Sequence, residues 1–77
     1  MSEPYLVDSI VKHVLRHNPR ARRKTVDEFL TESVGRSYRE RMGDLIVDSR
    51  IYRWNEDTIR AVRSGLFMML QNGMVER

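Results

Sequence analysis

Apolar and polar positions alternate at helical spacing through the first fifth of the chain. The apolar residues between Leu6 and Leu15 fall three or four apart and cover about half of a helix circumference. Ser2 is suited to cap the start of this helix. Pro19 disfavours helical geometry at Asn18, so we expect the helix to end before it. The pattern therefore predicts one amphipathic helix that lies on a core.

Two helix-start signals follow, with a glycine between them. Thr25 with Glu28, and Ser37 with Glu40, each have the spacing of a capping box, in which a hydroxyl and a carboxylate satisfy free amides of the first turn. Gly35 precedes the second signal and is suited to the left-handed conformation that ends a helix. We therefore expect one helix over residues 26–34, with Val26, Phe29 and Leu30 buried, and another over residues 38–48. The core residues expected in the second helix are Tyr38, Met42, Leu45 and Ile46.

The last third predicts a short strand and a long helix. Residues 50–54 are a mixture of basic, β-branched and aromatic residues, which favours a half-buried strand with Ile51 pointing inward. Asn55 is a suitable cap for a helix over residues 56–72. Residues 74–77 have room for one further short strand. The whole pattern predicts a mainly α fold, a compact domain of three to four helices spanning residues 1–77.

Charge is distributed unevenly along the chain. The net charge is only +3, but residues 16–24 hold five basic residues and no acidic one. Such a patch suits a surface that meets a polyanion on one side. The loop over residues 18–24 is therefore either an arm that contacts phosphates or an ordinary solvated loop, and we favour phosphate contact.

The stretch from Pro4 to Trp54 resembles a winged helix-turn-helix domain. Phe29, Leu30, Thr31, Val34 and Gly35 match the first helix and turn of that family. Met42, Leu45 and Ile46 resemble the anchors of a recognition helix, and residues 51–54 resemble the strand that enters the wing. The resemblance implies a helix-turn-helix with at most a short β-hairpin or wing remnant.

The same resemblance implies a double-stranded DNA partner. Arg36 and Arg39 become the candidates for reading bases, because a guanidinium bridges the two acceptors of a guanine edge. The DNA-binding residues expected are Arg20, Arg22, Arg23, Lys24, Arg36, Ser37, Arg39, Arg41, Arg50 and Arg53. An alternative places recognition on the helix over residues 56–72, with Arg60 and Arg63 reading bases. RNA in place of DNA also remains open.

The last helix carries apolar residues outside its core stripe. Ala61 and Gly65 are small and four apart, which lets another helix approach, and residues 66–70 are apolar all round. A homodimer with an interface of Ala61, Gly65, Phe67 and Met68 is therefore expected. Together with the DNA partner, this predicts a dimeric transcriptional regulator or accessory factor. The alternative is a protein-interaction module, an adaptor or inhibitor, that uses this helix on another protein.

Other functional classes find little support in the sequence. His13 and His17 are four apart, but a third metal ligand has no obvious candidate, so no metal or other cofactor is expected. No nucleophile has a nearby base, so we predict neither an enzyme nor a small-molecule substrate. The chain has no cysteine and no apolar run long enough to cross a membrane, which favours a cytoplasmic protein without a membrane partner.

Overall fold

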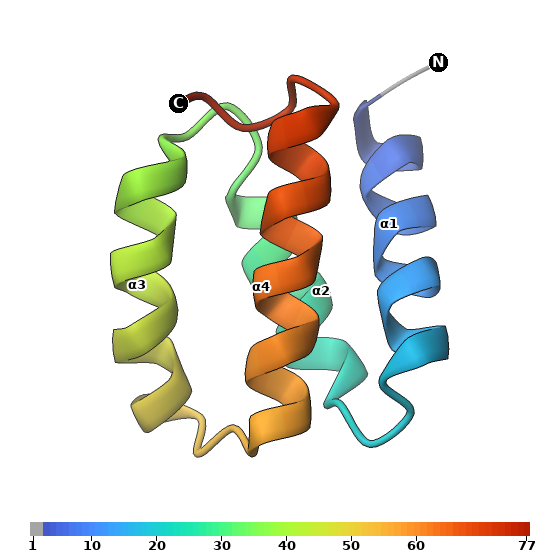
Figure 1. The fold of residues 1–77 in the computed structure, drawn as a ribbon, viewed down its shortest axis with the longest axis vertical. Helices are drawn as coiled ribbons and strands as arrows, with labels where there is room; N and C mark the ends of the chain where they lie inside the picture. The colour runs from blue at the N-terminus through green and yellow to red at the C-terminus, as the bar shows by residue number, and fades with distance from the viewer. Residues whose placement is uncertain (1–2) are drawn as a thin grey trace.

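The computed structural model describes residues 3–77, and these form four α-helices (Figure 1). They are α1 (Glu3–His17), α2 (Arg23–Glu32), α3 (Tyr38–Ile51) and α4 (Glu56–Gln71). The predicted mainly α class is confirmed. Ser2, the expected cap of α1, lies outside the described residues.

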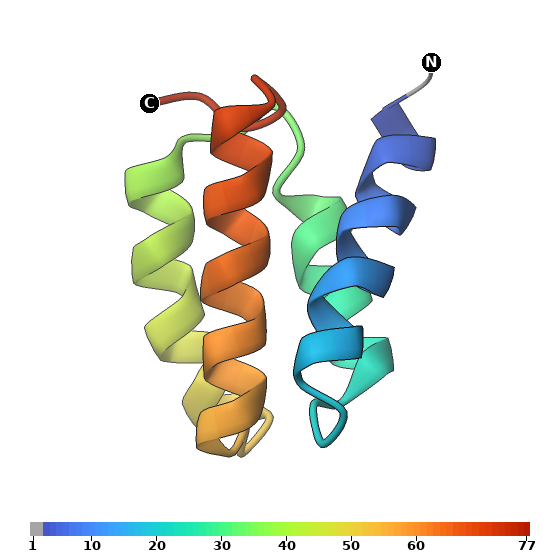
Figure 2. The same ribbon diagram turned by 45° about the vertical axis from the view of Figure 1, so that its right-hand side comes forward.

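Helix α4 is the centre of the domain. It packs against each of the other three helices, and α1 also packs against α2. Of the four described helices, α3 packs only against α4, beside which it runs in the opposite direction (Figures 1 and 2). Since α3 has one helical neighbour, a wide part of its surface stays exposed.

The core is built from the helical stripes that the sequence predicts. Leu30 of α2 and Val62, Leu66 and Met69 of α4 are fully buried, and α1 contributes Val11 and other valines. Trp54 is also buried, and its ring meets Phe29 edge to face at a centroid distance of 5.8 Å. The predicted hydrophobic faces of α1, α2 and α4 are therefore confirmed.

Two of the predicted helix starts rest on the expected caps, whereas α2 ends at Glu32 with Ser33 as its C-cap, so Gly35 lies in the turn beyond the cap. The Ser37 hydroxyl accepts a hydrogen bond from the Glu40 amide at 3.4 Å, and Asn55 Oδ1 accepts one from the Thr58 amide at 2.8 Å. Gly35 has a φ of +77°, which a residue with a side chain rarely adopts. These contacts begin α3 and α4 and turn the chain after α2.

The C-terminal tail is tied to the loop between α2 and α3. The Gly35 amide donates to the Met74 carbonyl and the Glu76 amide donates to the Arg36 carbonyl, each at 2.8 Å. Ser37 and Glu76 form a single parallel β-bridge. In the described part of the chain, this bridge stands in place of the short strand expected over residues 74–77. Val75 is buried beside this bridge.

Two predictions about the second half of the chain are wrong. Residues 50–54 form no strand, because α3 continues to Ile51 and a turn follows. Ile51 is 67% exposed and Ile46 is 55% exposed, although both were expected to point inward. The reason is that α3 packs only against α4, so that side chains on its outer side meet no other helix.

Candidate nucleic-acid interface

Two loops meet at one end of the domain. The loop between α1 and α2 and the loop between α3 and α4 both lie at the lower end in Figures 1 and 2, whereas the loop between α2 and α3 lies at the upper end with the tail. The Arg22 amide donates to Thr58 Oγ1 at 3.3 Å, and Arg22 Nη1 donates to the Tyr52 carbonyl at 3.1 Å. The two loops are therefore held together by contacts that cross between them.

Helix α2 begins earlier than its capping box predicts. Arg22 is the N-cap residue, and its side chain makes no capping hydrogen bond. Thr25 lies inside the first turn, where its hydroxyl donates to the Arg22 carbonyl at 3.2 Å and accepts from Trp54 Nε1 at 2.9 Å. The predicted Thr25 cap is thus wrong, because this hydroxyl is used to hold the tryptophan.

The turn after α3 is fixed by a residue in an unusual conformation. Arg53 has a φ of +55°, in the left-handed region that favours glycine. The Trp54 amide donates back to the Ser49 carbonyl at 2.9 Å, which closes the helix end in a Schellman-type turn. The Tyr52 ring stacks on the Trp54 ring at 5.7 Å, and Tyr52 stays 40% exposed.

We define the basic end as the exposed cations of these two loops and of the first turn of α2. Ion pairs among the described residues join Lys12 to Asp8, Arg60 to Glu56, and both Arg36 and Arg41 to Asp44. None of these pairs uses a cation of the basic end, so its charges face solvent without a carboxylate partner. The basic end consists of Arg20, Arg22, Arg23, Lys24 and Arg53.

The field of α2 adds to this positive charge. The N-terminus of a helix carries partial positive charge from its unpaired amides, and acidic residues usually neutralise it. The first turn of α2 has no acidic residue and instead holds Arg23 and Lys24. Side-chain and backbone charges of the same sign are therefore concentrated at one place, an arrangement that attracts anions.

The remaining predicted DNA-binding residues do not all lie together. Arg36, Ser37 and Arg39 belong to the opposite end, where the start of α3 adjoins the tail, whereas Arg50 is exposed in the last turn of α3, at the same end as Arg53. Arg36 Nη2 is 3.5 Å from Asp44 Oδ2, so this guanidinium is already paired. The structure thus divides the predicted set between two ends of the domain.

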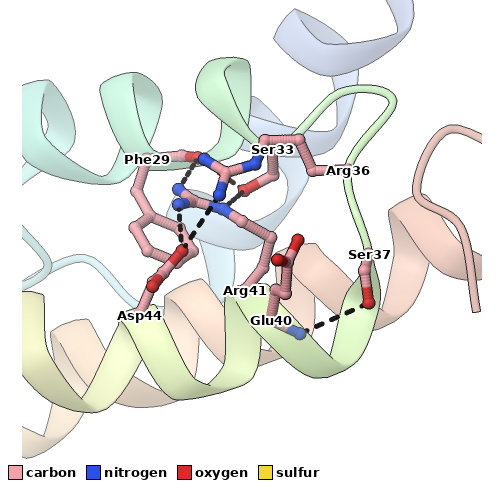
Figure 3. Close-up of polar contacts among 7 residues, drawn as sticks. All are labelled: Phe29, Ser33, Arg36, Ser37, Glu40, Arg41 and Asp44. Atoms are coloured by element: carbon pink, nitrogen blue, oxygen red, sulfur yellow. Dashed lines mark hydrogen bonds and ion pairs between the residues drawn. The ribbon is translucent and has the colours of Figure 1, made fainter.

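Arg41 is a structural residue and not a surface cation. Only 3% of it is exposed, and its guanidinium lies between α2 and α3 (Figure 3). Nε donates to Ser33 Oγ at 2.7 Å, Nη2 to the Phe29 carbonyl at 3.1 Å, and Nη1 to Asp44 at 2.8 Å. The same guanidinium lies 4.0 Å from the centre of the Phe29 ring. The prediction that Arg41 binds DNA is therefore wrong, because its guanidinium is buried and its donors are used within the domain.

Half of the predicted dimer interface is buried within the domain. Ala61 is fully buried, and Gly65 is buried against Leu30, so that a Cβ at Gly65 would lie 2.6 Å from Leu30 Cδ1. Gly65 thus lets α2 of the same chain approach α4, and both small residues are covered within the domain, which corrects their assignment to a partner chain. Phe67 is 51% exposed, and Met68 is half-buried against the core.

The alternative recognition residues lie on an open face of α4. Arg60 and Arg63 are exposed and line a depression of about 530 Å³ together with Tyr38, Met42 and Phe67. Placing recognition on α4 requires that a helix and a turn precede α4. The turn over residues 52–55 meets this requirement, because it joins α3 to α4. Arg60 is weakly paired with Glu56, at 4.0 Å.

Metal binding and membrane insertion find no geometric support in the part of the chain described. The rings of His13 and His17 lie 4.8 Å apart on an exposed face of α1, and no group of three potential metal ligands occurs among the described residues. None of the described helices has both the length and the apolar character needed to cross a bilayer.

Comparison of the chain with protein-family models, with curated proteins and with solved structures finds no match.

Proposed function

We propose that this protein binds nucleic acid through the basic end, with double-stranded DNA as its partner. The observation that supports this most is the convergence of two basic segments, thirty residues apart in sequence, on one end of the domain. The contacts of Arg22 and Trp54 hold these segments in place. Because these contacts already fix the two segments, their backbone loses little conformational entropy when phosphates bind.

The proposed chemistry is neutralisation of the phosphate backbone. Arginine forks at Arg20, Arg23 and Arg53 suit bidentate contacts with phosphate oxygens, and Lys24 adds a point charge at the start of α2. Tyr52 presents a partly exposed ring beside them, which suits stacking on a base or a sugar. Phosphate contacts of this kind position a protein on nucleic acid without reading its sequence.

The resemblance to winged helix-turn-helix domains supports DNA over RNA as the partner. We propose that bases, where they are read, are read by Arg60 and Arg63 of α4 instead of Arg36 and Arg39. The first pair lies on an open face of a helix that follows a turn, and Arg63 is in none of the ion pairs among the described residues, whereas Arg36 is paired with Asp44. Such a protein would act as a small transcriptional regulator or accessory factor.

Salt-dependent binding tests the proposal. If all five cations of the basic end contact phosphates, log Kobs should fall with log salt at a slope of about −4 to −5 on duplex DNA. The double variant Arg23→Ala/Lys24→Ala should reduce the magnitude of this slope by about 2. The matched control, Arg39→Ala/Arg77→Ala, removes the same charge at the opposite end and should leave the slope unchanged.

Three results would decide against the proposal: no binding to DNA at low salt, a slope near zero, or equal losses in the two double variants. Equal losses would mean that only net charge matters. Parallel measurements on single-stranded DNA and on duplex RNA decide among the nucleic acids. A change of sequence preference in Arg63→Ala, with the slope reduced by no more than about 1, is the expected sign of base reading on α4.

A protein-interaction module is the second candidate function. The exposed ring of Phe67 at the depression beside Tyr38 and Met42 favours it, because half-exposed aromatic residues beside a hollow are typical of protein contacts. Absent DNA binding at low salt, together with a partner protein whose binding is lost in Phe67→Ala, would support this candidate over the first.

A further inference from the structure

The outward face of α3 carries a regular stripe of exposed residues. Glu40, Gly43, Val47 and Arg50 follow one another at spacings of three, four and three, which places them on one line along the helix. All four are exposed, and Val47 is 55% exposed although it is apolar. Ile46 flanks this stripe and is equally exposed. This stripe is the outer seam of α3.

Gly43 has no role within the single chain that explains it. A Cβ at this position would meet nothing within 4 Å, and its backbone conformation is not the left-handed one. Glycine in the middle of a helix nevertheless destabilises it by about 1 kcal/mol relative to alanine. Its one structural benefit on an outward face is that it lets a second helix approach closely.

We propose that the outer seam is an interface between two copies of this chain, packed antiparallel about a two-fold axis. The three–four–three spacing is that of the contact positions in a coiled coil. Pairing two outer seams antiparallel, with the axis crossing the outward side of α3 level with residue 45, puts Val47 of each copy against Gly43 of the other. The same register puts Glu40 of each copy against Arg50 of the other.

Self-complementarity is the reason to choose a second copy as the occupant. A two-fold interface must match itself, so that residue i meets residue j and residue j meets residue i. The outer seam meets this condition in both shape and charge, since each valine meets a glycine and each acid meets a base. A parallel pairing would instead place Glu40 against Glu40 and Arg50 against Arg50, which is unfavourable.

The surroundings of the seam suit such a contact. A depression of about 360 Å³, lined mainly by apolar side chains of α3 and α4, adjoins Gly43 and Ile46. Ile46 of the second copy lies near the two-fold axis in this register, at the mouth of the depression. The self-association expected from the sequence would therefore use exposed residues of α3 and not the buried small residues of α4.

Sedimentation equilibrium of the full chain tests the proposal. We expect a concentration-dependent dimer for the wild type and a self-association constant at least about tenfold weaker for Gly43→Leu. Thermal unfolding of Gly43→Leu under monomeric conditions should show a fold at least as stable, because a Cβ at this position meets nothing within 4 Å and leucine favours a helix over glycine. A loss of dimer is then not a loss of folding.

Charge exchange tests the register. Glu40→Arg and Arg50→Glu should each weaken the dimer, and the double variant should restore it. Glu32→Arg, the same charge change on exposed α2, is the control and should leave the dimer unchanged. A monomeric wild type would overturn the proposal, as would a dimer that tolerates Gly43→Leu. A double variant no better than the single variants would overturn the antiparallel register.

Discussion

Replacing Arg41 with alanine should destabilise this domain more than any other single loss of charge on its surface or in its core. The side chain makes hydrogen bonds to Ser33, to the Phe29 carbonyl and to Asp44, at 2.7, 3.1 and 2.8 Å. The substitution would remove these bonds and the cation–π contact with Phe29, and it would leave a cavity between α2 and α3. The contacts join helices that otherwise do not pack against each other.

The magnitude follows from these contacts. A hydrogen bond from a charged donor contributes about 1.5–3 kcal/mol, and a desolvated cation–π contact contributes up to about 2 kcal/mol. Removing the buried guanidinium also removes its desolvation penalty, so the terms do not add in full. We therefore expect a net loss of about 3 kcal/mol in the free energy of unfolding. For a domain of this size that corresponds to a fall in Tm of about 12–24 °C.

Urea unfolding followed by circular dichroism and by Trp54 fluorescence measures this loss. Arg41→Lys keeps the charge but loses the planar fork, and should lose about half as much. Arg39→Ala, an exposed arginine on the same helix, is the control and should change stability by less than about 0.5 kcal/mol. A loss below about 1 kcal/mol in Arg41→Ala would refute the view that this side chain joins α2 to α3.

The remaining predictions concern glycine and charge. Gly43→Ala should raise the stability of the monomer by about 1 kcal/mol, whereas Gly65→Ala should lower it by about 1 kcal/mol because its Cβ meets Leu30 at 2.6 Å; thermal unfolding compares the two. Lys24→Glu should stabilise the fold by about 0.5 kcal/mol through the α2 dipole, as measured by calorimetry. The same substitution should weaken DNA binding, as measured by titration. Arg53→Gly should relieve the left-handed strain and raise stability by about 0.5 kcal/mol while also weakening binding.

Local signals predicted much of the fold. The caps at Ser37 and Asn55 are contacts between residues three apart, and the turn at Gly35 is signalled by the glycine itself, so the local sequence is enough to identify them. The buried faces of α1 and α4 follow from helical periodicity. These features are decided by neighbours in the sequence, and the structure agrees with them.

Long-range contacts account for the errors. Residues 50–54 have a strand-like composition, but Trp54 binds Thr25 and Phe29 and the α3–α4 turn forms around it. Small residues such as Ala61 and Gly65 make room for a neighbouring helix. Periodicity alone does not tell whether that helix is α2 of the same chain or a helix of a partner chain. The buried role of Arg41 depends on Ser33, eight residues earlier, and no motif signals it.

The candidate site was predicted in composition but not in arrangement. The basic stretch ending at Lys24 and the later arginines Arg50 and Arg53 were all expected to contact phosphates. That they meet at one end of the domain, while Arg36 and Arg39 lie at the other, depends on how α2 and α3 are oriented around α4 (Figure 1).

The position of the chain ends has a practical consequence for studying this protein. Helix α1 begins, and the tail after Val75 ends, on the side of the domain opposite the basic end (Figures 1 and 2). A fluorophore, affinity handle or additional domain tethered at either terminus would therefore point away from a bound polyanion. Immobilising the protein by its terminus should leave the arginine-rich loops free to meet ligand in solution.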